Sequence, residues 1–165
     1  MPRRDPFVDP EPLVRRVYAY VAYRVGDGPD AEDITSAAVE RALWYRDRFD
    51  SGKGEAAAWL VGIARRQISD HFDAQPLVVA EPPEELSPRE LDDDVATRLD
   101  LRAAVGRLGA RDRELVALRY GADLTARQIG EIVGLQTNAV EVALHRALQS
   151  LREVLQQPRV GVKSE

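Results

Sequence analysis

The fold is decided by the stretch from Thr125 to Ala147, which reads TARQIGEIVGLQTNAVEVALHRA. Apolar residues recur at the spacing of one helix face on each side of a central glycine, at Ile129, Ile132 and Val133 and then at Val140 and Leu144. That glycine, Gly134, lies where the first helix must end and the chain must turn. A positive φ at such a position is free of steric strain only for glycine. The pattern predicts two helices joined by a tight turn, a helix-turn-helix.

The same stretch indicates how the two helices cross and what the second one can touch. Gly130 is small at the point where the helices would approach closely. Thr137 or Asn138 can cap the second helix, which in helix-turn-helix proteins normally lies in the major groove of DNA. Two amphipathic helices with a glycine turn also occur in all-helical proteins that never touch nucleic acid, so the rest of the chain must decide between these interpretations.

Composition excludes several classes of protein. The 165 residues suffice for one large or two small domains, and 44% hydrophobic and 31% charged residues are normal for a soluble globular protein. No run approaches the roughly 20 apolar residues of a membrane span, and no apolar signal-peptide core follows the first six residues. With no cysteine, the chain has no disulfide, thiolate metal site or cysteine nucleophile. We expect a cytoplasmic protein that needs no metal and no cofactor.

The net charge of −5 is concentrated in one segment. Residues 74–100 hold eight acidic and two basic side chains, a charge of −6 that leaves +1 for the rest of the chain. The flanking halves are therefore nearly neutral, and we expect their affinity for naked DNA to be modest.

Four prolines and the acidic run mark a linker over residues 75–94. Residues 8–74 before it and residues 95–157 after it are predicted to form two helical domains, each with a small core of its own. Helical spacing indicates segments at about 13–24, 30–45 and 55–72, then at about 95–108 and 111–120, followed by the two helices of the opening stretch, the second reaching about Gln156. No convincing period-two strand appears, so the predicted class is all-α.

Three stretches in order resemble the extracytoplasmic-function (ECF) sigma factors of bacterial RNA polymerase. The first is DAEDI at 30–34, followed by Arg41-Ala42 and Phe49-Asp50, and it is similar to the core-binding part of sigma region 2. The second is AWLVGIARR at 58–66, ending in Asp70-His71, and it is similar to the promoter-melting part of that region. The third runs from Leu108 to Arg152 through the helix-turn-helix and is similar to region 4.

The resemblance implies a function without enzymatic chemistry. A sigma factor binds the polymerase core, at the clamp helices of the largest subunit and at the flap, reads two promoter elements and helps to open the duplex. Family members are often held inactive by an anti-sigma factor, which is a further expected partner. Membrane insertion is not expected.

Three groups of residues are implied to carry this function. On the helix over 30–45, the side chains expected to contact polymerase are Asp30, Glu32, Asp33, Ile34 and Val39. At the minus-ten element, arginines can hold phosphates beside a loop over 50–56 that captures a flipped base, and the expected residues are Lys53, Arg65, Arg66 and Gln67. At the minus-thirty-five element, glutamine and asparagine can read adenine and cations can hold phosphates, and the expected residues are Arg127, Gln136, Thr137, Asn138, His145 and Arg146.

Several of these residues have simpler interpretations. The acidic residues at 30, 32 and 33 also suit an ordinary helix N-terminus, and Thr137 or Asn138 can be a cap as well as a base contact. Trp59 is suited to stacking on a base, but its spacing with Leu60 and Ile63 favours the core, and Trp44 is likewise expected in the core.

The chain departs from the family pattern at several positions. Ser36 and Ala37 stand where the core-binding helix usually has a Gln-Glu pair, and Glu141 and Ala143 replace cations on the recognition helix. Phe72-Asp73 follows where a basic segment often continues. These changes motivate one alternative, a degenerate sigma factor that acts as a protein-interaction module. A stand-alone helix-turn-helix regulator is the other alternative, although the chain lacks a long heptad seam for dimerisation.

Overall fold

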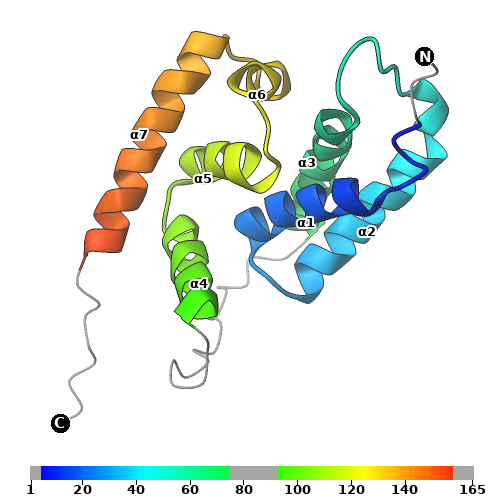
Figure 1. Ribbon diagram of the computed structural model, residues 1–165. Coiled ribbons are helices and arrows are strands. Elements are labelled where there is room, and N and C mark those ends of the chain that lie inside the picture. Colours follow the sequence, from blue (N-terminus) through cyan, green and yellow to red (C-terminus); the bar gives the residue numbers. More distant parts are fainter. Residues whose placement is uncertain (1–4, 75–92, 158–165) are drawn as a thin grey trace.

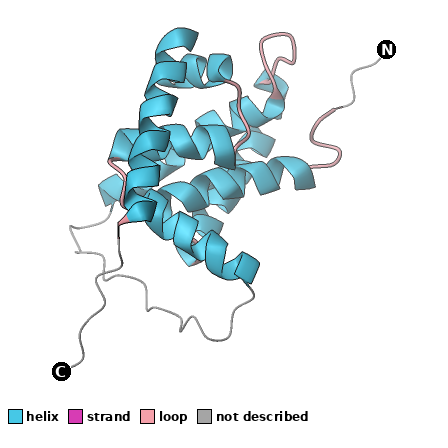
Figure 2. Cartoon of the chain, turned by 60° about the vertical axis from the view of Figure 1, so that its left-hand side comes forward, coloured by secondary structure: helices cyan, strands magenta, loops and turns pink. Residues whose placement is uncertain are grey.

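The computed structural model describes residues 5–74 and 93–157, and every regular element within them is helical (Figures 1 and 2). The all-α prediction is confirmed, with one helical module on each side of the acidic segment. The elements are α1 (Glu11–Val25), α2 (Pro29–Trp44), the short 3-10 turn η1 (Arg46–Arg48), α3 (Ala56–Ala74), α4 (Asp93–Gly106), α5 (Ala110–Val116), the π-helical turn η3 (Ala117–Gly121), α6 (Ala126–Val133) and α7 (Thr137–Gln156).

In the N-terminal half, α1 and α2 are separated by two glycines with positive φ. Gly26 closes α1 at φ 90°, and Gly28 precedes α2 at φ 136°, where most other residues would be strained. Pro29 then occupies the first turn of α2, where its missing N–H costs nothing. The helices pack closely because many of the buried residues of α2 and α3 are alanine, namely Ala31, Ala38, Ala42, Ala56, Ala57 and Ala64.

In the C-terminal half, α5 is shorter than the segment predicted at 111–120. The helix widens at Ala117, and the N–H of Ala122 bonds to the carbonyl of Ala117 at 3.0 Å, five residues back. This π-helical turn redirects the chain into the loop before α6. In Figure 1, α5 lies between α7 on one side and α1 on the other.

The two halves share their main core, so the prediction of two separate cores is wrong. One buried cluster combines side chains of both halves, including Val17, Tyr20, Ile34, Leu60, Ile68, Leu115, Leu118, Leu124, Ile129 and Val140. A smaller cluster belongs to the C-terminal half, at Ala104, Val105, Leu108, Val116, Ala147 and Leu151. Each half leaves one apolar face uncovered by its own helices, and the other half covers that face.

Gly121 lies at a close approach between the halves. A Cβ atom built on it would lie 3.0 Å from both the backbone N and the Cα of Tyr20, and 2.9 Å from Cδ2 of Tyr23. Because two of these three neighbours are backbone atoms of α1, a larger side chain would force the halves apart.

Candidate nucleic-acid and polymerase interfaces

The helix-turn-helix has the geometry that its sequence predicts. Gly134 ends α6 in the left-handed region at φ 76°, and its N–H bonds to the carbonyl of Gly130 at 2.9 Å. At Gly130 itself, a Cβ would lie 2.4 Å from the carbonyl oxygen of Leu135, so the turn folds directly over this position. The tight turn fixes the direction in which α7 leaves α6.

The start of α6 has a capping box that the sequence interpretation missed. The hydroxyl of Thr125 accepts a bond from the N–H of Gln128 at 3.2 Å, and the side chain of Gln128 accepts one from the N–H of Thr125 at 2.8 Å. The signal was present, since threonine followed three residues later by glutamine is the capping-box pattern.

The recognition helix α7 starts at Thr137, and the cap position is Gln136. No side chain caps this helix, so the cap predicted for Thr137 or Asn138 is wrong. Thr137 and Asn138 are instead exposed residues of the first turn, and Gln136 is exposed beside them. This places three hydrogen-bonding side chains at the helix end that meets base edges in helix-turn-helix proteins.

The cations expected near the minus-thirty-five phosphates are exposed, and acids accompany them. Arg127 lies in the first turn of α6, with its Nε 3.5 Å from the Glu131 carboxylate, while His145 and Arg146 are exposed on α7. Glu141 is exposed on α7 as well. The face therefore carries both signs of charge, which weakens a purely electrostatic hold on DNA.

The loop between η1 and α3 is built around aromatic side chains. Phe49 packs on Trp59 with 5.4 Å between ring centroids, and Phe7 contacts both rings edge-on at 5.8 and 5.9 Å. The carboxylate of Asp50 accepts a bond from the N–H of Gly52 at 2.8 Å and shapes the tip, where Lys53 is exposed. Trp59 also packs against the main core, as predicted.

The minus-ten cations of α3 differ in their surroundings. Arg66 is exposed and Gln67 is half-buried. Arg65 faces the C-terminal half, where its Nε donates to the Glu114 carboxylate at 2.5 Å and a terminal nitrogen donates to the carbonyl of Ile132 at 3.4 Å. The bond to Glu114 raises the pKa of Arg65 further, so its guanidinium stays charged.

Glu114 bonds to two arginines of the other half. Besides Arg65, Arg24 donates to its carboxylate at 3.2 Å and donates to the hydroxyl of Tyr20 at 3.2 Å. Burial of the Tyr20 hydroxyl raises its pKa to about 12, because the phenolate would have to be desolvated. One carboxylate of α5 thus accepts bonds from two arginines on two helices of the N-terminal half.

A second polar cluster closes the other end of the interface between the halves. Arg16 donates to the Glu55 carboxylate at 2.5 Å and to the carbonyls of Ala122 and Asp123 at 2.8 and 3.0 Å. The second carboxylate oxygen of Glu55 accepts a bond from the Gln128 amide at 2.9 Å. The bond from Arg16 holds the pKa of Glu55 below its ordinary value.

On α2, the expected polymerase contacts divide into two sets. Asp30 and Glu32 are exposed in its first turn, Asp33 is exposed just after that turn, and Val39 is half-buried. Ile34 is only 4% exposed and belongs to the main core, so the prediction of a surface contact for Ile34 is wrong. Its spacing with Ala38 and Ala42 puts it on the buried stripe of the helix.

The end of α2 presents an exposed apolar patch, and one of its residues, Trp44, was predicted to lie in the core. Leu43, Trp44 and Tyr45 are 47%, 80% and 39% exposed, so the core prediction for Trp44 is wrong. The helix period explains this, because Trp44 lies two residues, or about 200° of rotation, past buried Ala42. The guanidinium of Arg48 lies 4.8 Å from the centre of the Tyr45 ring, which adds positive charge to the patch.

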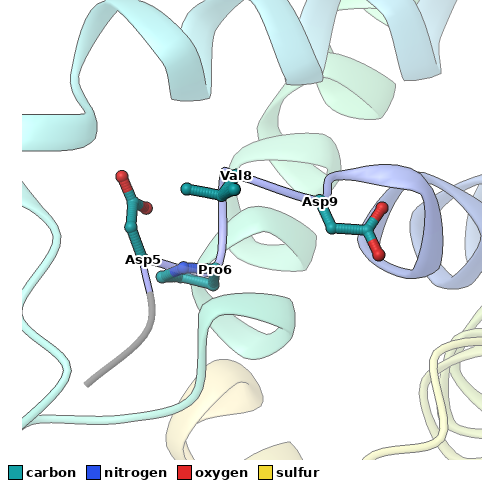
Figure 3. A pocket seen from close by; sticks show the side chains of 4 residues that line it. All are labelled: Asp5, Pro6, Val8 and Asp9. Carbon is teal, nitrogen blue, oxygen red and sulfur yellow. The ribbon is translucent and has the colours of Figure 1, made fainter. Parts of the chain in front are cut away.

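The N-terminal segment forms a hollow of about 430 Å³, lined by Asp5, Pro6, Val8 and Asp9 (Figure 3). Its only charged side chains are two carboxylates, which suit neither phosphate nor a flipped base. In residues 5–74 and 93–157, no group of three or more histidine, aspartate or glutamate residues is arranged to hold a metal ion. No helix in these ranges is long and apolar enough to span a bilayer.

Comparison with known proteins identifies both halves. The Sigma-70 region 2 family model matches residues 11–75, and the Sigma-70, region 4 model matches residues 104–153. The ECF RNA polymerase sigma factor BldN of Streptomyces coelicolor is 32% identical over 147 residues, which cover 84% of this chain and 56% of BldN. SigF of Caulobacter vibrioides, also an ECF RNA polymerase sigma factor, is 30% identical over 141 residues, 84% of this chain and 78% of SigF.

Solved structures give the same fold at lower identity. The sigma factor RpoE, in complex with the anti-sigma factor NepR from Bartonella quintana, superimposes with a TM-score of 0.66 at 21% identity, covering 95% of this chain and 100% of RpoE. CnrH, in complex with the cytosolic domain of CnrY, superimposes with a TM-score of 0.64 at 20% identity, covering 92% of this chain and 86% of CnrH.

Proposed function

Because the chain belongs to the sigma-70 family, among the ECF RNA polymerase sigma factors, we propose that it directs promoter-specific initiation by binding core polymerase and promoter DNA. The observation that carries the proposal is the exposed first turn of α7, on a helix-turn-helix within the region 4 match. The chain spans 56% of the length of BldN, so the role of the whole protein is part of the proposal.

In this proposal, region 4 reads the minus-thirty-five element through the first turn of α7. Gln136 and Asn138 are the side chains suited to reading adenine, and Thr137 lies between them. Two cations, Arg127 and Arg146, and His145 hold phosphates. The exposed acids of this face make the free protein a weak binder of DNA, so promoter recognition depends on polymerase.

Region 2 reads the minus-ten element through α3 and the loop before it. Lys53 at the loop tip and Arg66 on α3 are exposed and suited to phosphates. Gln67 and Arg65 lie next to Arg66 on the same helix. Arg65 becomes available to DNA only after it leaves Glu114.

The polymerase surface extends along α2 from its acidic first turn to its apolar end. Asp30, Glu32 and Asp33 provide carboxylates for basic groups of the clamp helices. In place of Ile34, the apolar contribution comes from the exposed pair Leu43 and Trp44. Aromatic side chains of this kind often contribute most of the binding energy at protein interfaces.

The proposal includes no chemistry of the protein's own and no cofactor, and it places the protein in the cytoplasm, with polymerase and the chromosome. An anti-sigma factor is a further proposed partner. Two solved structures of the same fold support it, since the sigma factor RpoE is in complex with the anti-sigma factor NepR and CnrH is in complex with the cytosolic domain of CnrY.

The test is run-off transcription with purified bacterial core polymerase, this protein and promoter fragments from its own genome. We expect specific transcripts that require the protein. Asn138→Ala and Arg66→Ala should each reduce transcription, because one removes a base contact, worth about 1–3 kcal/mol, and the other a phosphate contact. Gln149→Ala, at another exposed position of α7, is the matched control and should leave transcription unchanged.

Binding to core is measured separately by co-elution from a sizing column. Co-elution without any transcripts from the tested fragments would favour a protein-interaction module over an initiation factor. Absence of co-elution, together with tight binding to a specific DNA site, would favour a stand-alone regulator.

A further inference from the structure

We infer that Phe7 is a positioning residue for the exposed loop over residues 50–55, which we call the minus-ten loop. Its ring holds the start of this loop against α3 and thereby fixes where the loop meets promoter DNA. The inference rests on the proposed function, because it assumes that the loop reads the minus-ten element. It adds the N-terminal segment, residues 5–9, to the parts of the protein on which promoter reading depends.

The minus-ten loop is not held by the core. All six of its residues are exposed, and burial begins only at Ala56. Two hydrogen bonds close its turn, from the N–H of Gly52 to the Asp50 carboxylate at 2.8 Å and from the N–H of Lys53 to the Asp50 carbonyl at 3.0 Å. These bonds are local, so they set the shape of the turn but not its direction relative to α3. That direction depends on the residues that flank the loop.

The residue before the loop is Phe49, and its ring is held by two other rings. Phe49 packs on Trp59 of α3 with 5.4 Å between centroids. The Phe7 ring lies 5.8 Å from Phe49 and 5.9 Å from Trp59, at interplanar angles of 87° and 77°. This is the edge-to-face arrangement that aromatic rings prefer. Phe7 therefore joins the start of the loop to α3, the helix that carries Arg66.

A local turn presents Phe7 to the other two rings. The Asp5 carboxylate accepts a bond from the N–H of Phe7 at 2.9 Å, and the Asp5 carbonyl accepts one from the N–H of Val8 at 3.1 Å. Pro6 restricts the backbone between them. The next side chain, Val8, is 81% exposed, whereas Phe7 is half-buried. The turn thus places one ring of the segment, and not its neighbour, against the loop.

The N-terminal segment also shares a surface with the minus-ten loop. A second hollow of about 300 Å³ lies between them, and its lining comes from the segment, from η1 and from the start of the loop, at Asp5, Pro6, Phe7, Arg46, Asp47, Phe49 and Ser51. The segment therefore forms one wall of the surface beside the loop, and displacing Phe7 changes both.

A packing role and a positioning role for Phe7 have different consequences. A ring that only stabilises the protein affects transcription from all promoters alike. A ring that positions the minus-ten loop affects the choice between minus-ten sequences and leaves the choice between minus-thirty-five sequences unchanged. The test measures the ring contact first and the two choices second.

The first measurement is the quenching of Trp59 fluorescence by acrylamide. The chain has two tryptophans, and Trp44→Phe leaves Trp59 as the only one. Phe7→Ala in this background should make Trp59 more accessible to acrylamide, because Phe7 packs directly on it. Val8→Ala is the matched control at the adjacent exposed position and should leave the quenching unchanged.

The second measurement is run-off transcription by core polymerase with the full chain, in which Trp44 is retained. The templates are a genomic promoter from which the wild type transcribes and two copies of it, one altered only in the minus-ten element and one only in the minus-thirty-five element. Phe7→Ala should reduce the preference for the intact minus-ten element about two- to tenfold, the contribution of one edge-to-face ring pair. The preference for the intact minus-thirty-five element should not change.

Two further variants separate the ring from its position. Phe7→Tyr retains the ring and should retain the minus-ten preference. Asp5→Ala removes the carboxylate that closes the turn and leaves all three rings in place. It should shift both measurements in the same direction as Phe7→Ala but by less, and it provides the test if Phe7→Ala does not fold.

Circular dichroism establishes that each variant is folded before it is compared. Unchanged quenching in Phe7→Ala and Asp5→Ala would overturn the inference, because the ring would not be held on Trp59. An unchanged minus-ten preference, or an equal loss of preference at both elements, would also overturn it. Absence of transcripts with the wild type would reject the proposed function itself, whereas transcripts with unaltered preferences in the variants would reject only the role of Phe7.

Discussion

The carbonyl oxygen of Leu135 lies where a side chain at Gly130 would begin, with only 2.4 Å between that oxygen and a Cβ built on the glycine. The obstacle is backbone and belongs to the turn that sets the direction of α7. The orientation of the recognition helix thus depends on the absence of a single carbon atom.

Gly130→Ala should destabilise the C-terminal half or displace the turn, at a cost of about 1–3 kcal/mol, as is usual for overpacking. Thermal unfolding and DNA-binding assays measure the two effects. Gly62→Ala is the matched control, because nothing lies within 4 Å of a Cβ at that helical position. It should be neutral or stabilising by up to about 1 kcal/mol. Equal behaviour of the two variants would contradict the close approach at Gly130.

Ile34→Ala should lower the free energy of unfolding by about 2–5 kcal/mol, because Ile34 is in the core that both halves share. Chemical denaturation measures this loss. Asp33→Asn, at the adjacent exposed position, is the control and should leave stability within about 0.5 kcal/mol of wild type. An Ile34→Ala variant with normal stability but weak polymerase binding would instead support the surface contact that was predicted from the sequence.

Trp44→Ala should weaken binding to core polymerase by at least tenfold, as expected when a large aromatic side chain that anchors an interface is removed. Stability should stay nearly unchanged, since the side chain is 80% exposed. Titration of labelled protein with core polymerase gives the affinity. Val8→Ala is the control, an equally exposed apolar residue outside α2. Unaltered affinity in Trp44→Ala would remove the end of α2 from the proposed surface.

Thr125→Ala should destabilise the protein by about 1 kcal/mol, because it removes one side of the capping box of α6. Thr125→Ser retains the hydroxyl and should recover most of the loss. Thermal unfolding of the two variants measures the difference. If serine and alanine behave alike, the hydroxyl has no part in the stability of the helix.

Acid should loosen the contact between the halves at Glu55. The pKa of this carboxylate is held below its ordinary value, chiefly by the bond from Arg16. The ionised carboxylate therefore stabilises the contact fully at pH values above its ordinary pKa, and this stabilisation is lost as the pH falls through the lowered pKa. The effect is small because the side chain is 47% exposed. Energy transfer between dyes attached at Ser69→Cys on α3 and Gln149→Cys on α7 measures the contact. As the pH falls below 5, it should fall less steeply when Glu55→Gln is added to this labelled protein.

The sequence predicted what local rules determine. Helical spacing located the apolar faces, and the glycine at 134 located the turn, because positive φ and the helix period are properties of a few neighbouring residues. It was harder to predict which side chains near the end of a helix face the core. Trp44 was expected in the core, although the buried stripe through Ala38 and Ala42 already implies that Trp44 faces outward.

The shared core and the bonds of Glu114 could not be predicted from the sequence. They join positions such as Arg65 and Glu114, which are 49 residues apart, across a segment with no helical pattern. Region 2 and region 4 each look complete by periodicity, since an apolar stripe looks the same whether its own half or the other half covers it. Only the three-dimensional arrangement shows that α1 packs against η3.

The core that the halves share makes their separation sensitive to temperature. Opening transfers apolar side chains such as Val17 and Leu118 to water, and exposure of apolar surface raises the heat capacity. The free energy of opening is therefore a curved function of temperature, and the hydrophobic part of the attraction weakens on cooling. The fraction of molecules with separated halves should therefore be lowest at one temperature and should rise on both cooling and heating.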